Sequence, residues 1–218
     1  MQIRVNHVNL YYNKVGSGKP LILLHGNQEN HHIFDELAFE LKDYYTLYMI
    51  DSRNHGASEY TKEFNYDLMA DDIIALIHEL KLENPALLGY SDGGIIGLKV
   101  AMKEVSLLSH LILCSANLSP KGFDKKTIDE MIIAYLQEPS PYLKLMIEEP
   151  QIKPKDLNII QSKTLVIAGE YDLIKFKHTE LIHRHINHSS LLMMKGHDHF
   201  NYIVHQDLLK KIIIEFLE

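Results

Sequence analysis

Apolar residues gather along this chain in short, almost unbroken runs. In chain order the runs occupy residues 20–24, 46–50, 86–88, 110–114, 164–168 and 190–194. Runs of this length and branching are typical of strands that are buried on both faces, as in a parallel sheet. Between them apolar residues recur every three or four positions, for example over 69–80 and 208–216, which predicts amphipathic helices. The alternation predicts an α/β fold, with a mostly parallel sheet flanked by helices.

Two segments depart from this alternation. Residues 2–14 are strand-like and lead into Gly16-Ser17-Gly18, which predicts an antiparallel lead-in to the sheet. Residues 116–162 hold five of the seven prolines, spaced between short amphipathic stretches. We expect two or three short helices there, forming a small helical cap over one end of the sheet. Residues 1–115 and 163–218 would then form the core.

Composition narrows the class of protein. The 218 residues are 46% hydrophobic and 23% charged, which suits one globular domain with a sizeable core. The net charge of −7 and the lack of dense Lys and Arg clusters argue against nucleic acid and anionic membrane surfaces as partners.

No segment resembles a signal peptide or has about 20 consecutive apolar residues, so we expect a soluble cytoplasmic protein without a membrane span. The single Cys114 cannot form an internal disulfide. The sequence does not indicate an oligomeric state.

The most informative segment is Gly89-Tyr90-Ser91-Asp92-Gly93-Gly94, between a predicted strand and a predicted helix. A serine at the apex of such a tight turn is held in strained backbone geometry, and the flanking glycines are needed because side chains there would clash. This arrangement exposes the hydroxyl at the start of the helix. Ser91 is therefore a candidate nucleophile.

A serine nucleophile needs a histidine to take its proton and, in most cases, a carboxylate to orient that histidine. Asp172 follows the predicted strand at 164–168, and His197 follows the one at 190–194. The order serine, acid, histidine is typical of α/β-hydrolase folds. Glu170 and His199 are neighbouring alternatives, and we favour Asp172 and His197.

Five motifs occur in the order expected of one superfamily. They are His25-Gly26-Asn27, residues 51–58, the serine turn, Gly169-Glu170-Tyr171-Asp172 and Gly196-His197. With them the chain resembles the α/β-hydrolase superfamily, in its serine esterase and lipase-like branch, over nearly its whole length. The resemblance implies that Ser91 is the nucleophile, His197 the general base and acid, and Asp172 the orienting carboxylate.

The same resemblance implies an oxyanion hole formed by the backbone amides of Asn27 and Asp92, and no cofactor. Serine at the nucleophile position argues against the dehalogenase and epoxide hydrolase branches, which use aspartate there. The segment at 51–58 carries Asn54 where glycine is common in the family. We expect this segment to shape its turn and brace the oxyanion loop, without a catalytic role.

The sequence also offers candidate substrate contacts. The Asp92 carboxylate either interacts with the dipole of its helix or faces the pocket, where it would favour a substrate with a cationic amine. Apolar residues of the cap could form the roof of the pocket, or could be ordinary packing of cap helices on the core. The candidate substrate contacts are Asp92, Phe123, Tyr135, Tyr142 and Met146.

Fourteen histidines raise the question of metal binding. Among the four at His178, His183, His185 and His188, only the last two share a helix face, and no H-E-x-x-H pattern occurs. We therefore expect no metal site.

Taken together, these observations predict a serine hydrolase that cleaves small carboxylic esters through an acyl-enzyme, with a small-molecule ester as its partner. Thioester, amide, lactone and carbon-carbon bond hydrolysis remain open, because a triad alone does not choose the leaving group. Two further alternatives are a ligand-binding receptor with little turnover and a cofactor-free perhydrolase.

Overall fold

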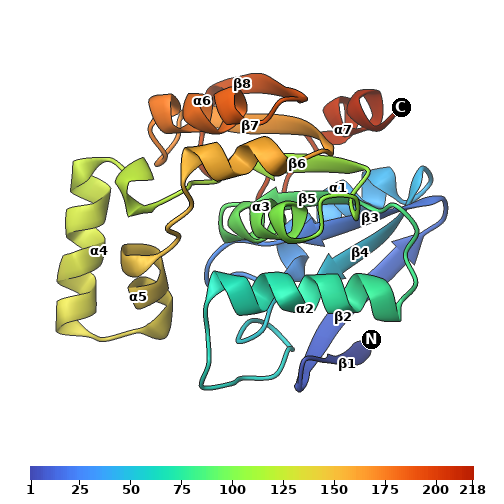
Figure 1. The fold of residues 1–218 in the computed structure, drawn as a ribbon, viewed down its shortest axis with the longest axis horizontal. Coiled ribbons are helices and arrows are strands. Elements are labelled where there is room, and N and C mark those ends of the chain that lie inside the picture. The colour runs from blue at the N-terminus through green and yellow to red at the C-terminus, as the bar shows by residue number, and fades with distance from the viewer.

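The computed structural model of the protein describes residues 1–218 and contains one eight-stranded sheet (Figure 1). The strands are β1 (Gln2–Val5), β2 (Val8–Gly16), β3 (Lys19–Leu24), β4 (Tyr45–Ile50), β5 (Ala86–Tyr90), β6 (His110–Cys114), β7 (Lys163–Tyr171) and β8 (Ser189–Asp198). Their order across the sheet is β1-β2-β4-β3-β5-β6-β7-β8. Strands β3 to β8 pair in parallel, whereas β1 and β2 are antiparallel, so the predicted lead-in is confirmed.

Helices cover both faces of the sheet, as the alternating pattern predicts. One face carries α1 (Asp35–Leu41) and α7 (Lys210–Leu217), and the other carries α2 (Tyr66–Glu79), α3 (Asp92–Lys103) and α6 (Phe176–His185). Each face has its own cluster of fully buried aliphatic and aromatic side chains. The predicted α/β fold class is thereby confirmed, and the parallel strands all end at the same edge of the sheet.

The proline-rich interval contains α4 (Lys125–Gln137) and α5 (Pro141–Glu148), with short 3-10 turns at Pro120–Gly122 and Pro154–Ile159. Figure 1 shows α4 and α5 beyond one end of the sheet, away from the helices that flank it. No residue of α4 is fully buried, so this helix adds little to the core. The division of the chain into a core and a cap stays a prediction.

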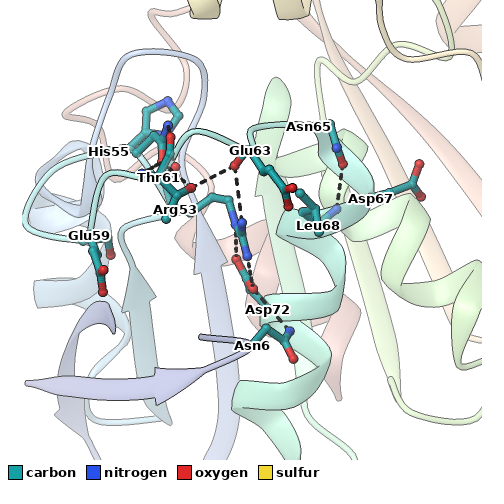
Figure 2. A network of polar contacts seen from close by, with 12 residues as sticks. Asn6, Arg53, His55, Glu59, Thr61, Glu63, Asn65, Asp67, Leu68 and Asp72 are labelled. Atoms are coloured by element: carbon teal, nitrogen blue, oxygen red, sulfur yellow. Dashed lines mark hydrogen bonds and ion pairs between the residues drawn. The ribbon is translucent and has the colours of Figure 1, made fainter. Parts of the chain in front are cut away.

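A buried ion pair fixes the loop that follows β4. Arg53 donates two hydrogen bonds to the Asp72 carboxylate, from Nε at 2.6 Å and from Nη2 at 2.7 Å (Figure 2). Asn6, in the turn between β1 and β2, donates a third to the same carboxylate at 3.2 Å. Both charged side chains are almost fully buried. The pair therefore ties the segment at 51–58 to α2 and to the sheet edge.

Candidate active site

Ser91 lies at the sharp turn between β5 and α3, as its motif predicts. Its φ of +51° is in the left-handed region, which non-glycine residues rarely adopt. A β-carbon on Gly89 would overlap the carbonyl of Gly93, and one on Gly93 would overlap the carbonyl of Leu24. The two glycines therefore allow β5, α3 and the loop after β3 to approach closely enough to present the serine hydroxyl.

The imidazole that meets this hydroxyl belongs to His199. Its Nε2 is 3.2 Å from Ser91 Oγ, and its Nδ1 is 2.6 Å from Oδ1 of Asp172. The side chains of His199 and Asp172 are only 5% and 2% exposed, so the pair is shielded from water. The three groups form a continuous chain of contacts from hydroxyl to imidazole to carboxylate.

The prediction that His197 occupies this position is therefore wrong. His197 is partly exposed and its Nδ1 is 2.9 Å from the side-chain oxygen of Asn201. The physical reason is the length of β8, which continues past the apolar run to Asp198, where it pairs with Tyr171 of β7. His197 thus lies inside the strand, and His199 is the first residue to leave it. The other local alternative, Glu170, accepts a hydrogen bond from the Gly196 amide at 2.8 Å and takes no part in the chain of contacts.

Donors around Asp172 hold its carboxylate in the charged form. Burial alone would raise its pKa, but hydrogen bonds from His199, the Ile174 amide and the Ser115 hydroxyl lower the pKa below its ordinary value. Ser115 Oγ also lies 2.6 Å from the hydroxyl of Tyr202. Because the single proton of Ser115 goes to the carboxylate, Tyr202 is the donor to Ser115. Sequence reasoning missed Ser115 and Tyr202, since neither belongs to a motif.

The sequence predicts that the backbone amides of Asp92 and Asn27 form an oxyanion hole, and both lie next to Ser91 or in the loop that borders it. Asp92 is the first residue of α3, where an N–H has no acceptor within the helix. Asn27 lies in the loop after β3, and its N–H donates no hydrogen bond within the protein. The Asn27 side chain donates a hydrogen bond to the Asp92 carboxylate at 2.8 Å, which links the two segments.

The predicted brace from the segment at 51–58 is also present, because His25 Nε2 accepts a hydrogen bond from the Ser52 amide at 3.1 Å.

The Asp92 carboxylate is occupied by the protein's own donors. Tyr66 donates to Oδ1 at 2.8 Å, and Asn27 occupies Oδ2. Burial raises the pKa of Asp92 to about 6, although both hydrogen bonds act in the opposite direction. Asp92 does not line the cavity beside Ser91, so the predicted contact of its carboxylate with a substrate amine is wrong.

A cavity of about 190 Å³ opens beside the nucleophile. The lining residues are Gly26, Asn27, Gln28, Glu29, Tyr90, Ser91, Phe123, Met131, Met146, Leu173, His199 and Phe200. Phe123 and Met146 are there, as the sequence predicts. Tyr135 is not, and Tyr142 donates instead to the carbonyl of Asn54, in a neighbouring hollow. Sequence reasoning also missed Glu29, which no motif singles out.

Other features of the sequence take no part in this site. Cys114 is fully buried, and burial raises the pKa of its thiol. The prediction that His185 and His188 share a helix face is wrong, because α6 ends at His185. No three His, Cys, Asp or Glu side chains are grouped as they would be around a metal ion. None of the helices has the length and apolar character required to cross a bilayer.

The sequence and the fold of this chain are similar to those of known proteins. Residues 19–138 match the model of a family described as "alpha/beta hydrolase fold". The chain is 29% identical to the AB hydrolase superfamily protein YisY of Bacillus subtilis (strain 168), over 96% of each chain. It is also 29% identical to a putative esterase/lipase of Haemophilus influenzae, over 77% of this chain and 59% of that protein. Among solved structures, the esterase EaEST of Exiguobacterium antarcticum superposes with a TM-score of 0.83 at 23% identity, over 98% of this chain and 97% of that one.

Proposed function

The chain belongs to the alpha/beta hydrolase fold family, and from this membership we propose that it is a serine hydrolase that cleaves small carboxylic esters. Relatives named as hydrolases and esterases support hydrolase activity. The observation that carries the proposal is the contact chain from Ser91 through His199 to Asp172. This arrangement serves acyl transfer, because it couples deprotonation of a hydroxyl to charge stabilisation on the imidazole.

The first half of the reaction forms an acyl-enzyme. The Nδ1–H of His199 donates a hydrogen bond to the Asp172 carboxylate, so Nε2 is unprotonated and can take the proton of Ser91 as Oγ attacks the ester carbonyl. The carbonyl π pair moves onto oxygen to give a tetrahedral oxyanion, and Asp172 stabilises the imidazolium that forms. When the carbon-oxygen bond to the alcohol breaks, Nε2 returns its proton to the departing oxygen. The alcohol leaves, and Ser91 carries the acyl group.

The second half repeats these steps with water as the nucleophile. His199 takes a proton from water, the hydroxide attacks the acyl carbonyl, and Nε2 protonates Ser91 Oγ as the carboxylic acid leaves. In both halves the oxyanion would be bound by the amides of Asn27 and Asp92. A donor aimed at a developing oxyanion is worth about 3 to 4 kcal/mol.

The cavity supports short acyl groups. Its volume of about 190 Å³ is small, and Phe123, Met131, Met146 and Leu173 give it apolar walls. Apolar walls favour an uncharged acyl chain, since burying apolar surface is worth about 25 cal/mol per Å². We therefore expect acetate and butyrate esters to be better substrates than octanoate esters.

Turnover of a series of p-nitrophenyl esters, from acetate to octanoate, tests the proposal. We expect the purified protein to hydrolyse the short esters and the Ser91→Ala variant to lose that activity. Ser190→Ala is the matched control, because Ser190 is an exposed serine of β8 outside the site. Wild-type turnover no faster than the buffer rate would contradict the proposal, and tight binding of an ester without turnover would favour the receptor alternative.

A further inference from the structure

Glu29 is the one acidic residue that lines the cavity beside Ser91, and no lysine or arginine lines it. The only other titratable side chains in the lining are His199 and Tyr90. His199 is already engaged by Asp172, and the nearby carboxylate of Asp92 is occupied by Asn27 and Tyr66. The charge of the cavity wall is therefore decided by Glu29.

The Glu29 carboxyl group lies close to the nucleophile. Its Oε2 accepts a hydrogen bond from the Gly26 amide at 2.9 Å. The point at which Gly26 would carry a β-carbon is 2.7 Å from this oxygen and 3.2 Å from Cβ of Ser91, so both side chains border the same small space. The second carboxyl oxygen, Oε1, makes no hydrogen bond within the protein. One oxygen is thus held by the loop, whereas the other has no hydrogen-bond partner within the protein. Glu29 also borders the neighbouring hollow that contains Tyr142.

We infer that Glu29 determines the charge preference of the site: it favours esters that carry a cationic ammonium group and disfavours those that carry a carboxylate. This inference rests on the proposed esterase function and specifies its substrate class. A half-buried carboxylate has lost part of its hydration, so pairing with a cation compensates it, whereas a second anion would add repulsion.

The preference depends on pH, because Glu29 has to be ionised. Burial raises the pKa of Glu29 to about 7, and Asp92 adds to the rise, while the Gly26 amide and the imidazoles of His199 and His205 oppose it. A carboxyl with this pKa is mostly neutral at pH 6 and mostly charged at pH 8. The selectivity for a cation should therefore increase as the pH rises through 7.

The test uses pairs of esters that differ only in charge. Acetylcholine and 3,3-dimethylbutyl acetate place a trimethylammonium group or its tert-butyl isostere on the alcohol side. The phenyl esters of 4-(trimethylammonio)butanoate and 5,5-dimethylhexanoate do the same on the acyl side. Quaternary ammonium groups do not titrate, and the ratio of the two kcat/KM values within a pair cancels every effect of pH that both esters share. Hydrolysis is followed by acid release at constant pH.

At pH 8 we expect the ratio of cationic to neutral kcat/KM in at least one pair to fall about tenfold in Glu29→Gln, because the trimethylammonium group loses its charge attraction to a partly buried carboxylate. The ratio should rise from pH 6 to pH 8 in the wild type and stay flat in the variant. Glutamine keeps the length of the side chain, and its amide oxygen can still accept from Gly26. Glu79→Gln, which removes an exposed carboxylate on α2, is the control and should keep the wild-type ratio.

Unchanged ratios in both pairs, or an equal change in Glu79→Gln, would overturn the inference while leaving the esterase function in place. Absence of turnover of the neutral esters by the wild type would overturn the proposed function itself, and the inference with it. Circular dichroism of each variant shows whether a changed ratio comes from a folded protein.

Discussion

Nε2 of His199 lies 3.2 Å from Oγ of Ser91, although 108 positions separate the two residues in the chain. The contact exists because β5 and β8 run in the same direction and end at the same edge of the sheet. The histidine two positions earlier is still inside β8 and faces Asn201. This difference of two residues decides which histidine lies beside Ser91.

The first prediction concerns these two histidines. His199→Gln should lower kcat for p-nitrophenyl butyrate by at least about 10⁴-fold, because nothing else is placed to take the serine proton. His197→Gln, the matched control, should stay within about twofold of the wild type. Steady-state kinetics of both purified variants measures these changes in kcat. A larger loss of kcat in His197→Gln than in His199→Gln would refute the assignment of His199.

The second prediction concerns the hydroxyl groups behind Asp172. Ser115 has a φ of +55°, so glycine can replace it without backbone strain. Ser115→Gly removes one donor to the carboxylate, and Tyr202→Phe removes the donor to Ser115. A hydrogen bond to a charged group is worth about 1.5 to 3 kcal/mol, so we expect Ser115→Gly to lower kcat/KM by about tenfold or more and Tyr202→Phe to lower it less.

The pH profile of kcat/KM shows whether these hydroxyls act on the triad. With fewer donors the pKa of Asp172 rises, so the acid limb of the profile should move to higher pH in both variants. Reduced activity with an unmoved acid limb would mean that Ser115 and Tyr202 only contribute to packing.

The third prediction concerns the buried pair in Figure 2. Arg53→Met leaves the Asp72 carboxylate buried without its cation, and Asp72→Leu leaves the guanidinium without its anion. Each single variant should lose about 3 to 5 kcal/mol of unfolding free energy, measured in urea. The double variant should lose less than the two single losses combined, because neither charge then remains uncompensated. Additive losses would show that the charges do not interact.

The fourth prediction concerns pH and the buried His25. Burial, followed by the repulsion of His55, lowers its pKa to about 4. Between pH 6.5 and 4 the unfolded chain therefore binds a proton at this position that the folded protein does not. The contribution of His25 to the unfolding free energy is therefore complete above pH 6.5. It falls as the pH is lowered, and at pH 4 about 2 to 3 kcal/mol of it is lost.

Carboxyl groups with raised pKa values, such as Glu29 and Asp92, act in the opposite direction over part of this range. The contribution of His25 is therefore the difference in slope between the wild type and His25→Asn, in plots of unfolding free energy against pH. Replacement of the exposed His188 by asparagine should leave the slope unchanged. Equal slopes for the wild type and His25→Asn would contradict the prediction.

Sequence reasoning succeeded where the signal is local. The apolar runs predicted the strands from β3 to β8. Strands β3 to β7 are mostly buried, so few polar positions interrupt their runs. β8 lies at the edge of the sheet and has no fully buried residue, so the expectation that it is buried on both faces is wrong. The serine turn was also predictable, since the spacing of Gly89, Ser91 and Gly93 expresses a steric requirement that one short segment contains in full.

The sequence did not predict features that depend on pairing between distant segments of the chain. The end of β8 is set by the contact of Asp198 with Tyr171, which neither strand's own pattern reveals. His197 and His199 are two positions apart, so strand alternation does not distinguish them. The roles of Ser115 and Glu29 likewise arise from contacts made only after folding.

Covalent labelling shows whether His199 activates Ser91. A fluorophosphonate transfers its phosphonyl group to a serine that is activated by a histidine, and mass spectrometry of the digested protein locates the adduct. We expect a single adduct on Ser91, formed at a rate that falls by orders of magnitude in His199→Gln and is unchanged in His197→Gln. An unlabelled protein, an adduct on another residue, or full labelling of His199→Gln would contradict this expectation.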